Sequence, residues 1–175
     1  AKALSLSKAT CTRAINDLSA SGLISQTAEG TNKWITTAYT KSELLEKAYG
    51  RLKTPVDRIL YVKGTAQIEH PIASGIRALA RQSMIGVNDQ DGAIAISKKE
   101  AAKIPAEDIC TKQYFEDFGG AVIEVWSYDP IILERDGCVD DISLLLSMDN
   151  DPNERVQTCL DEIRQKHGLP IKEEE

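Results

Sequence analysis

Near the amino end of the chain, apolar positions recur with the period of a helix. Four of them are spaced three or four residues apart and so share one side of a helix: Cys11, Ala14, Ile15 and Leu18. Ser7 precedes this stretch and is a suitable N-cap, because its hydroxyl can accept from a backbone N–H of the first turn. Gly22 follows it, where helices commonly end in the left-handed conformation. The pattern predicts a helix from Lys8 to Ser21 with a buried apolar stripe.

Two β-prone segments come next, at residues 23–27 and 33–37, around a loop at 28–32 that is rich in turn residues. They predict a hairpin, which directly behind such a helix is the wing of a winged helix. Thr40-Lys41-Ser42-Glu43 then matches a capping box and predicts a helix that Pro55 ends. The apolar stripe of that helix is Leu44, Leu45, Ala48 and Leu52. Residues 1–4 are interpreted as the last turn of a further helix, and residues 5–7 as a tight turn.

After Pro55 the pattern alternates between strands and helices. Short apolar runs predict strands at residues 56–62, 93–96 and 121–128, and helical periodicity predicts helices at 72–84, 98–104, 139–148 and 152–167. Such alternation is typical of an α/β domain with its own core. We therefore expect an α+β fold: an N-terminal winged helix-turn-helix that lacks its first helix (1–54), a separate α/β C-terminal domain for regulation or dimerisation (55–171), and an acidic tail (172–175).

Charge is divided unevenly between these parts. The whole chain of 175 residues has a formal net charge of −6. Residues 1–53 nevertheless hold eight basic and four acidic side chains, a net charge of +4, so the rest carries −10. A basic head on an acidic body predicts that any polyanion meets the head.

Candidate chemistry in the body is sparse. The four cysteines form no CxxC pair and there are only two histidines, so a metal site is not expected. Glu124 lies on a predicted strand but lacks the lysine of a PD-(D/E)xK nuclease, and Gly119-Gly120 lacks the rest of a phosphate loop. Nothing local supports His70 as a base for a thiol. We expect no enzyme activity and no cofactor. Without a signal peptide or a long apolar run, a cytoplasmic protein with no membrane partner is expected.

A family resemblance can be stated on the residues of the head. Leu4-Ser5-Leu6-Ser7-Lys8-Ala9-Thr10-Cys11-Thr12-Arg13-Ala14-Ile15-Asn16-Asp17-Leu18, continued by Gly22-Leu23-Ile24, resembles the helix-turn-helix of MarR-type winged-helix regulators over about 40 residues. The resemblance implies that the helix faces DNA with Lys8, Thr10, Thr12, Arg13 and Asn16. It implies wing contacts from Thr31, Asn32 and Lys33. The usual wing-tip arginine is missing, and so is the amino-terminal helix that often supports dimerisation in that family.

Physical chemistry gives these side chains distinct roles. In the major groove, an arginine can read guanine and an asparagine can read adenine through paired hydrogen bonds. The hydroxyls of Ser7 and the threonines, with the helix amino terminus, suit phosphate oxygens. Four net charges are a modest electrostatic footprint, so a homodimer on double-stranded DNA is expected. The plainer alternative is an amphipathic helix on a globular surface.

The body has a looser resemblance of its own. Residues 72–84, 124–130, 139–144 and 154–156 resemble a class of bacterial winged-helix proteins that are in turn similar to AbiEi-type antitoxins. The sequence therefore predicts a bacterial transcriptional regulator that binds specific duplex DNA, as a repressor. The alternative is an antitoxin-like interaction module that neutralises a protein partner. An enzyme with a site in the body is the least favoured interpretation.

Overall fold

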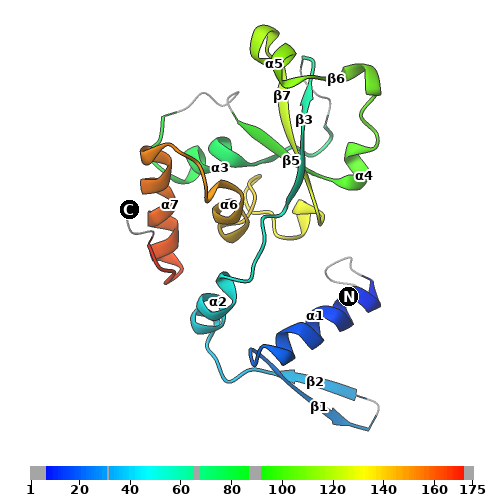
Figure 1. Cartoon of the computed structure of the whole chain (residues 1–175), viewed down its shortest axis with the longest axis vertical. Coiled ribbons are helices and arrows are strands. Elements are labelled where there is room, and N and C mark those ends of the chain that lie inside the picture. Colours follow the sequence, from blue (N-terminus) through cyan, green and yellow to red (C-terminus); the bar gives the residue numbers. More distant parts are fainter. Residues whose placement is uncertain (1–6, 31, 65–67, 87–91, 172–175) are drawn as a thin grey trace. The chain divides into compact units, whose positions relative to one another are not determined.

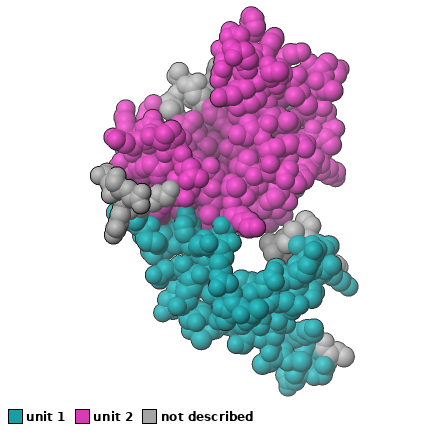
Figure 2. All heavy atoms as spheres, in the orientation of Figure 1, with its two compact units in different colours: residues 1–52, 165–175 teal, residues 53–164 magenta. Residues whose placement is uncertain are grey.

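The computed structural model describes residues 7–30, 32–64, 68–86 and 92–171. They form a mixed α+β fold in which helices and strands alternate. The chain separates into two compact units, one of residues 1–52 with 165–175 and one of residues 53–164 (Figure 2). The predicted helical turn at residues 1–4 and the acidic tail at 172–175 lie outside the described residues.

The first unit is a helix, a hairpin and a second helix (Figure 1). Helix α1 spans Lys8–Ala20, strands β1 and β2 span Ser25–Glu29 and Asn32–Thr36, and helix α2 spans Lys41–Tyr49. The strands pair antiparallel up to Glu29 opposite Asn32, so the connection is shorter than the predicted loop at 28–32. Cross-strand hydrogen bonding continues through residues whose turn propensity favoured a loop.

Local capping of both helices follows the sequence. The Ser7 hydroxyl accepts from the backbone N–H of Thr10 at 3.0 Å, and Gly22 has a φ of +71° after the end of α1. Thr40 and Glu43 form the predicted capping box of α2. The backbone N–H and the hydroxyl of Thr40 both donate to the Glu43 carboxylate. These two hydrogen bonds, the backbone one foremost, lower the pKa of Glu43. Helix α2 ends at Tyr49, with Gly50 as its C-cap, and does not continue to Pro55.

The predicted buried stripe of α1 is not buried. Cys11 and Ile15 are half-buried, Ala14 is exposed, and Leu18 is 39% exposed. Among the described residues up to Leu52, only Leu23 is buried. A 13-residue helix, a two-stranded hairpin and a nine-residue helix contribute too little apolar surface to cover one another.

The second unit is built on a five-stranded sheet in the order β4-β5-β7-β3-β6. Its strands are β3 (Val56–Val62), β4 (Ile72–Ala73), β5 (Ala93–Ser97), β6 (Ile109–Cys110) and β7 (Ala121–Trp126). Its helices are α3 (Gly75–Gln82), α4 (Lys98–Ala101), α5 (Lys112–Phe118), α6 (Asp141–Met148) and α7 (Glu154–Lys166), of which α7 ends just beyond this unit. Short 3-10 turns, η2 and η3, occupy Ala106–Asp108 and Pro130–Ile132. Of the strand pairs in the described residues, only β5 with β7 is parallel.

Several predicted boundaries in this unit were wrong. The helix predicted at 72–84 begins only at Gly75, because Ile72 and Ala73 pair with β5 as an edge strand. The helix after Ser97 has its predicted cap but stops at Ala101. Strand β6 and helix α5 were not predicted. The two residues of β6 are ordered by pairing with β3, a tertiary interaction that local patterns do not record.

The two faces of the sheet are filled differently. One face carries the cluster of Val62, Ile96, Ala101, Ile123 and Val125, in which Ala101 comes from α4. On the other, α3 packs against β5 and α6 (Figure 1). Because side chains alternate along a strand, this second face receives Glu124 and Trp126 of β7.

Gly120 shows how closely the sheet packs at the start of β7. Its φ is +145°, and a Cβ placed there would overlap the carbonyl oxygen of Val62. Gly119 has a φ of +74°, but a Cβ there would meet nothing within 4 Å. Of these two glycines, Gly120 is the one at which a neighbouring backbone comes close enough to exclude a side chain.

Candidate functional site

Helix α1 presents a polar, basic surface. At about 100° per residue, Lys8, Thr12 and Asn16 lie within an arc of about 80°, with Arg13 about 60° further round. All four side chains are exposed. Within the described part of the chain, no hydrogen bond or ion pair engages the side chains of Lys8, Arg13 or Asn16. Their donors and acceptors face solvent.

The hydroxyl groups near the start of α1 are already engaged. Ser7 Oγ lies 2.8 Å from Thr10 Oγ1 while it caps the helix, and Thr12 Oγ1 donates to the carbonyl oxygen of Lys8 at 3.0 Å. Thr10 lies toward the other flank of the helix, about 160° round from Thr12. The structure therefore brings Lys8, Thr12, Arg13 and Asn16 together and leaves Thr10 at the margin.

The described part of the hairpin presents two of the three polar side chains that the resemblance implied. Asn32 and Lys33 are exposed at the start of β2, and Thr31 lies outside the described residues. The most prominent exposed groups on β2 are apolar: Trp34 is 56% exposed and Ile35 is 49% exposed. Because neighbouring residues of a strand point to opposite faces, the hairpin shows one apolar side chain on each face.

The second unit holds a buried carboxylate at the centre of its sheet. Glu124 is 9% exposed, between Ile123 and Val125, which are fully buried on the opposite face. Its Oε2 accepts from Ser74 Oγ at 2.6 Å and from Trp126 Nε1 at 3.0 Å. Glu124, which lacks the neighbouring lysine of the nuclease motif, is therefore held by a hydroxyl and an indole. No lysine or histidine side chain is bonded to it in the described structure.

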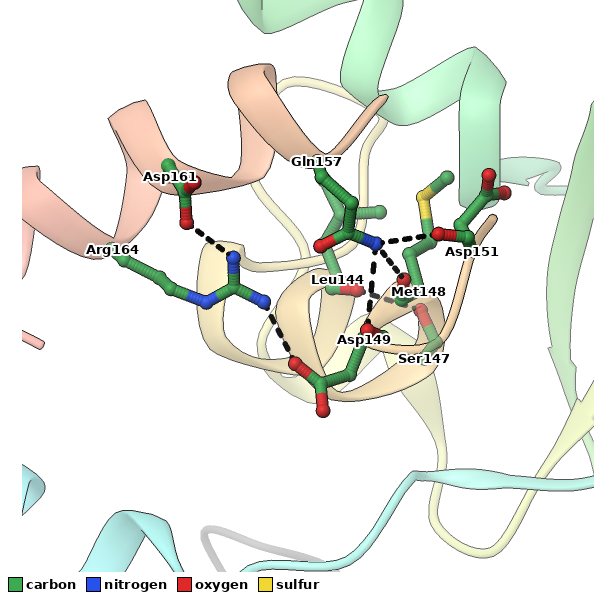
Figure 3. A network of polar contacts seen from close by, with 8 residues as sticks. All are labelled: Leu144, Ser147, Met148, Asp149, Asp151, Gln157, Asp161 and Arg164. Carbon is green, nitrogen blue, oxygen red and sulfur yellow. Dashed lines mark hydrogen bonds and ion pairs between the residues drawn. The ribbon is translucent and has the colours of Figure 1, made fainter. Parts of the chain in front are cut away.

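A second polar network joins α6 to α7. Arg164 is 1% exposed and forms ion pairs with Asp149 at 2.7 Å and Asp161 at 2.6 Å (Figure 3). The Gln157 amide donates to the carbonyl oxygens of Met148, Asp149 and Asp151. Asp149 is the C-cap of α6, and its ion pair with Arg164 ties the end of α6 to α7.

The half-buried Tyr128 makes a further polar contact, with α6. Its hydroxyl lies 2.6 Å from Ser143 Oγ, and its ring meets Trp126 edge-on at 5.4 Å. Burial raises the pKa of the Tyr128 phenol; the hydrogen bond with Ser143 opposes this shift, and the nearby charge of Asp140 adds to it. Trp126, which is 1% exposed, and the half-buried Tyr128 are packing residues.

Sequence reasoning did not anticipate Ser74, Glu124 and Arg164 as members of buried networks. A carboxylate inside an otherwise apolar strand was the one local signal for Glu124, because an isolated buried charge requires hydrogen-bonding partners. Ser74 is 50 residues away in the chain. Its role could not be read from spacing.

The described helices include none that is long and apolar enough to cross a membrane. Comparisons with protein-family models, with curated proteins and with solved structures give no match to this chain.

Proposed function

We propose that the protein binds duplex DNA in a sequence-dependent manner through α1, as a winged-helix transcriptional regulator that acts as a repressor. The observation that carries the proposal is that four exposed side chains lie on one side of a capped helix: Lys8, Thr12, Arg13 and Asn16. Within the described residues, the side chains of Lys8, Arg13 and Asn16 form no hydrogen bond or ion pair. An arginine and an asparagine three residues apart supply the two side chains best suited to guanine and adenine.

The charge distribution supports the same proposal. Residues 1–53 have a net charge of +4 in a chain of net charge −6. Phosphate contacts supply much of the affinity for DNA, and four charges from one copy are few. We therefore propose that two copies bind together, with the acidic body supplying the dimer contact.

The test selects duplexes from a randomised pool with the full chain and then measures binding by fluorescence anisotropy at several salt concentrations. Lys8→Ala should weaken binding to every sequence and lower the salt slope by about one. Arg13→Ala and Asn16→Ala should each cost about 1–3 kcal/mol on the selected site and relax its base preference. Arg58→Ala, on the second unit and equally exposed, serves as the matched control.

Failure of the full chain to bind any duplex at low salt would refute the proposal. Binding that depends equally on Arg13 and Arg58 would also contradict it, since a non-specific basic surface would then account for the affinity. Sedimentation of the complex gives its stoichiometry, and one chain per duplex would refute the dimer.

A second candidate is an interaction module for a protein partner, of the antitoxin kind. The exposed Trp34 and Ile35 on the hairpin favour it, because aromatic and aliphatic side chains are typical anchors of protein interfaces. Under this proposal Trp34→Ala abolishes binding of a co-expressed partner and leaves duplex binding unchanged. A loss of duplex binding alone would instead assign the hairpin to the DNA interface.

A further inference from the structure

An open cavity of about 490 Å³ lies beside Glu124 in the second unit. Its lining comes from Thr54, from the start of α3 at Gly75 and Ile76, from the strand residues Ala93 and Glu124, and from the end of α6 with the loop through residue 151. Every lining residue belongs to the unit of residues 53–164, so the cavity is complete within that unit. Its volume lies in the range of small-molecule sites.

One oxygen of the Glu124 carboxylate accepts no hydrogen bond from the described residues. Both hydrogen bonds to this side chain end on Oε2. Within the part of the chain that the structure describes, Oε1 accepts no hydrogen bond and no cationic side chain pairs with Glu124. A Cβ at Gly75 would lie 3.8 Å from Oε1, so the glycine leaves that oxygen uncovered toward the cavity. Oε1 is therefore the oxygen of this carboxylate that a donor in the cavity can reach.

The other ionisable side chains that line the cavity are acidic, as Glu124 is. Asp149 and Asp151 are the other ionisable residues there, and none of the lining residues is basic. Arg164 holds one oxygen of Asp149, whereas Asp151 Oδ1 accepts only the backbone N–H of Asn153 in the described structure. Helix α6 also ends at the cavity, so its partial negative charge adds to those of the carboxylates.

The acidic loop is held in place before any ligand arrives. The Gln157 amide bonds the carbonyl oxygens of Met148 and Asp149 at 3.5 and 3.4 Å and that of Asp151 at 2.8 Å (Figure 3). Because the loop is already ordered, less conformational entropy is lost when a ligand binds, and the affinity is higher.

We propose that this cavity binds a small organic cation with an ammonium or guanidinium group, which donates hydrogen bonds to Glu124 Oε1. Charge-assisted hydrogen bonds of this kind are the strong ones, and a buried carboxylate at the base with a second carboxylate at the loop suits a molecule with a cationic group at each end. A metal ion fits less well, because no three His, Cys, Asp or Glu side chains of the described residues gather closely enough to hold one. The site goes beyond the proposed DNA binding and does not depend on it.

The test titrates the full chain with agmatine, which has a guanidinium and an ammonium group, by isothermal calorimetry and thermal shift in the absence of DNA. Butylurea serves as the uncharged analogue. Agmatine should bind with a Kd below about 1 mM and raise the Tm, and butylurea should do neither.

Glu124→Gln is the decisive variant, because its side-chain oxygen can still accept from Ser74 and Trp126 while an NH₂ group replaces Oε1. It should weaken agmatine binding at least about tenfold. Asp151→Asn keeps its cap for Asn153 and should weaken binding about twofold to fivefold. Glu116→Gln, the same chemical change on the exposed surface of α5, should leave binding unchanged.

Absence of agmatine binding up to about 10 mM, or equal binding of butylurea, would overturn the proposal. So would a folded Glu124→Gln protein with unchanged affinity, or Mg²⁺ that displaces agmatine at equal concentration. If Glu124→Gln does not fold, Asp151→Asn decides, and an affinity equal to that of Glu116→Gln overturns the proposal.

Discussion

Arg164 provides the sharpest test of what holds the second unit together. Its side chain is 1% exposed, and Asp149 and Asp161, which pair with it among the described residues, have side chains 36% and 24% exposed. Removing one member of a buried ion pair costs about 3–5 kcal/mol, because the remaining charge loses its partner. Both carboxylates here can regain water, so Arg164→Met should cost less, about 2–3 kcal/mol. Methionine keeps much of the apolar stem, which isolates the loss of charge.

Urea unfolding followed by tryptophan emission measures this cost. The chain has two tryptophans, of which Trp34 is exposed and Trp126 is 1% exposed, so a Trp34→Phe background reports on the second unit. With a slope of about 1–3 kcal/mol per molar urea, a cost of about 2–3 kcal/mol should lower the midpoint by about 0.7–3 M. Lys98→Met breaks a 2.8 Å ion pair with Asp57 whose side chains are 56% and 38% exposed, and it should cost under about 1 kcal/mol. Equal midpoints for the two variants would refute the reasoning.

Three further predictions concern backbone packing and titration. Gly120→Ala should destabilise the second unit by more than about 3 kcal/mol in urea unfolding, whereas Gly119→Ala, with strain alone, should cost about 1–2 kcal/mol; equal costs would contradict the overlap. The lowered pKa of Glu43 means that its contribution to α2 is present above pH 4.5 and is lost as the pH falls below it. Circular dichroism should show this loss, and Glu43→Gln should abolish it. The raised pKa of Tyr128 means that its contribution to stability is present below pH 10 and falls as the pH rises above it; absorbance titration at 295 nm should show a phenol that ionises above pH 10, and Tyr128→Phe should remove that step.

Local signals in the sequence determined the helix starts and several strands. Ser7 and Ser97 cap the helices that follow them, and Thr40 with Glu43 forms the expected capping box. These features involve side chains three residues from the backbone groups they bond, so a short window of sequence contains all the interacting partners. The strands predicted at 56–62 and 121–128 form β3 and β7, and β7 ends two residues earlier than predicted, at Trp126.

The candidate DNA interface was named almost entirely from the sequence, and its function stays a proposal. The positions of Lys8, Thr12, Arg13 and Asn16 on one side of α1 follow from helical periodicity alone. Periodicity could not tell that the opposite, apolar side remains largely exposed in the described residues. Burial depends on which elements contribute a covering surface, and that is a property of the tertiary arrangement.

Only the tertiary structure decided which polar residues act together in the second unit. Ser74 and Glu124 are 50 residues apart, and Arg164 meets Asp149 across 15 residues, on elements whose pairing no local pattern specifies. The same holds for β6, which exists through its pairing with β3, and for Gly120, whose lack of a side chain matters only because the Val62 carbonyl approaches it. Short-range hydrogen bonds and periodicity are encoded locally, whereas the open oxygen of Glu124 and the acidic cavity beside it arise only when β7, α3 and α6 are brought together.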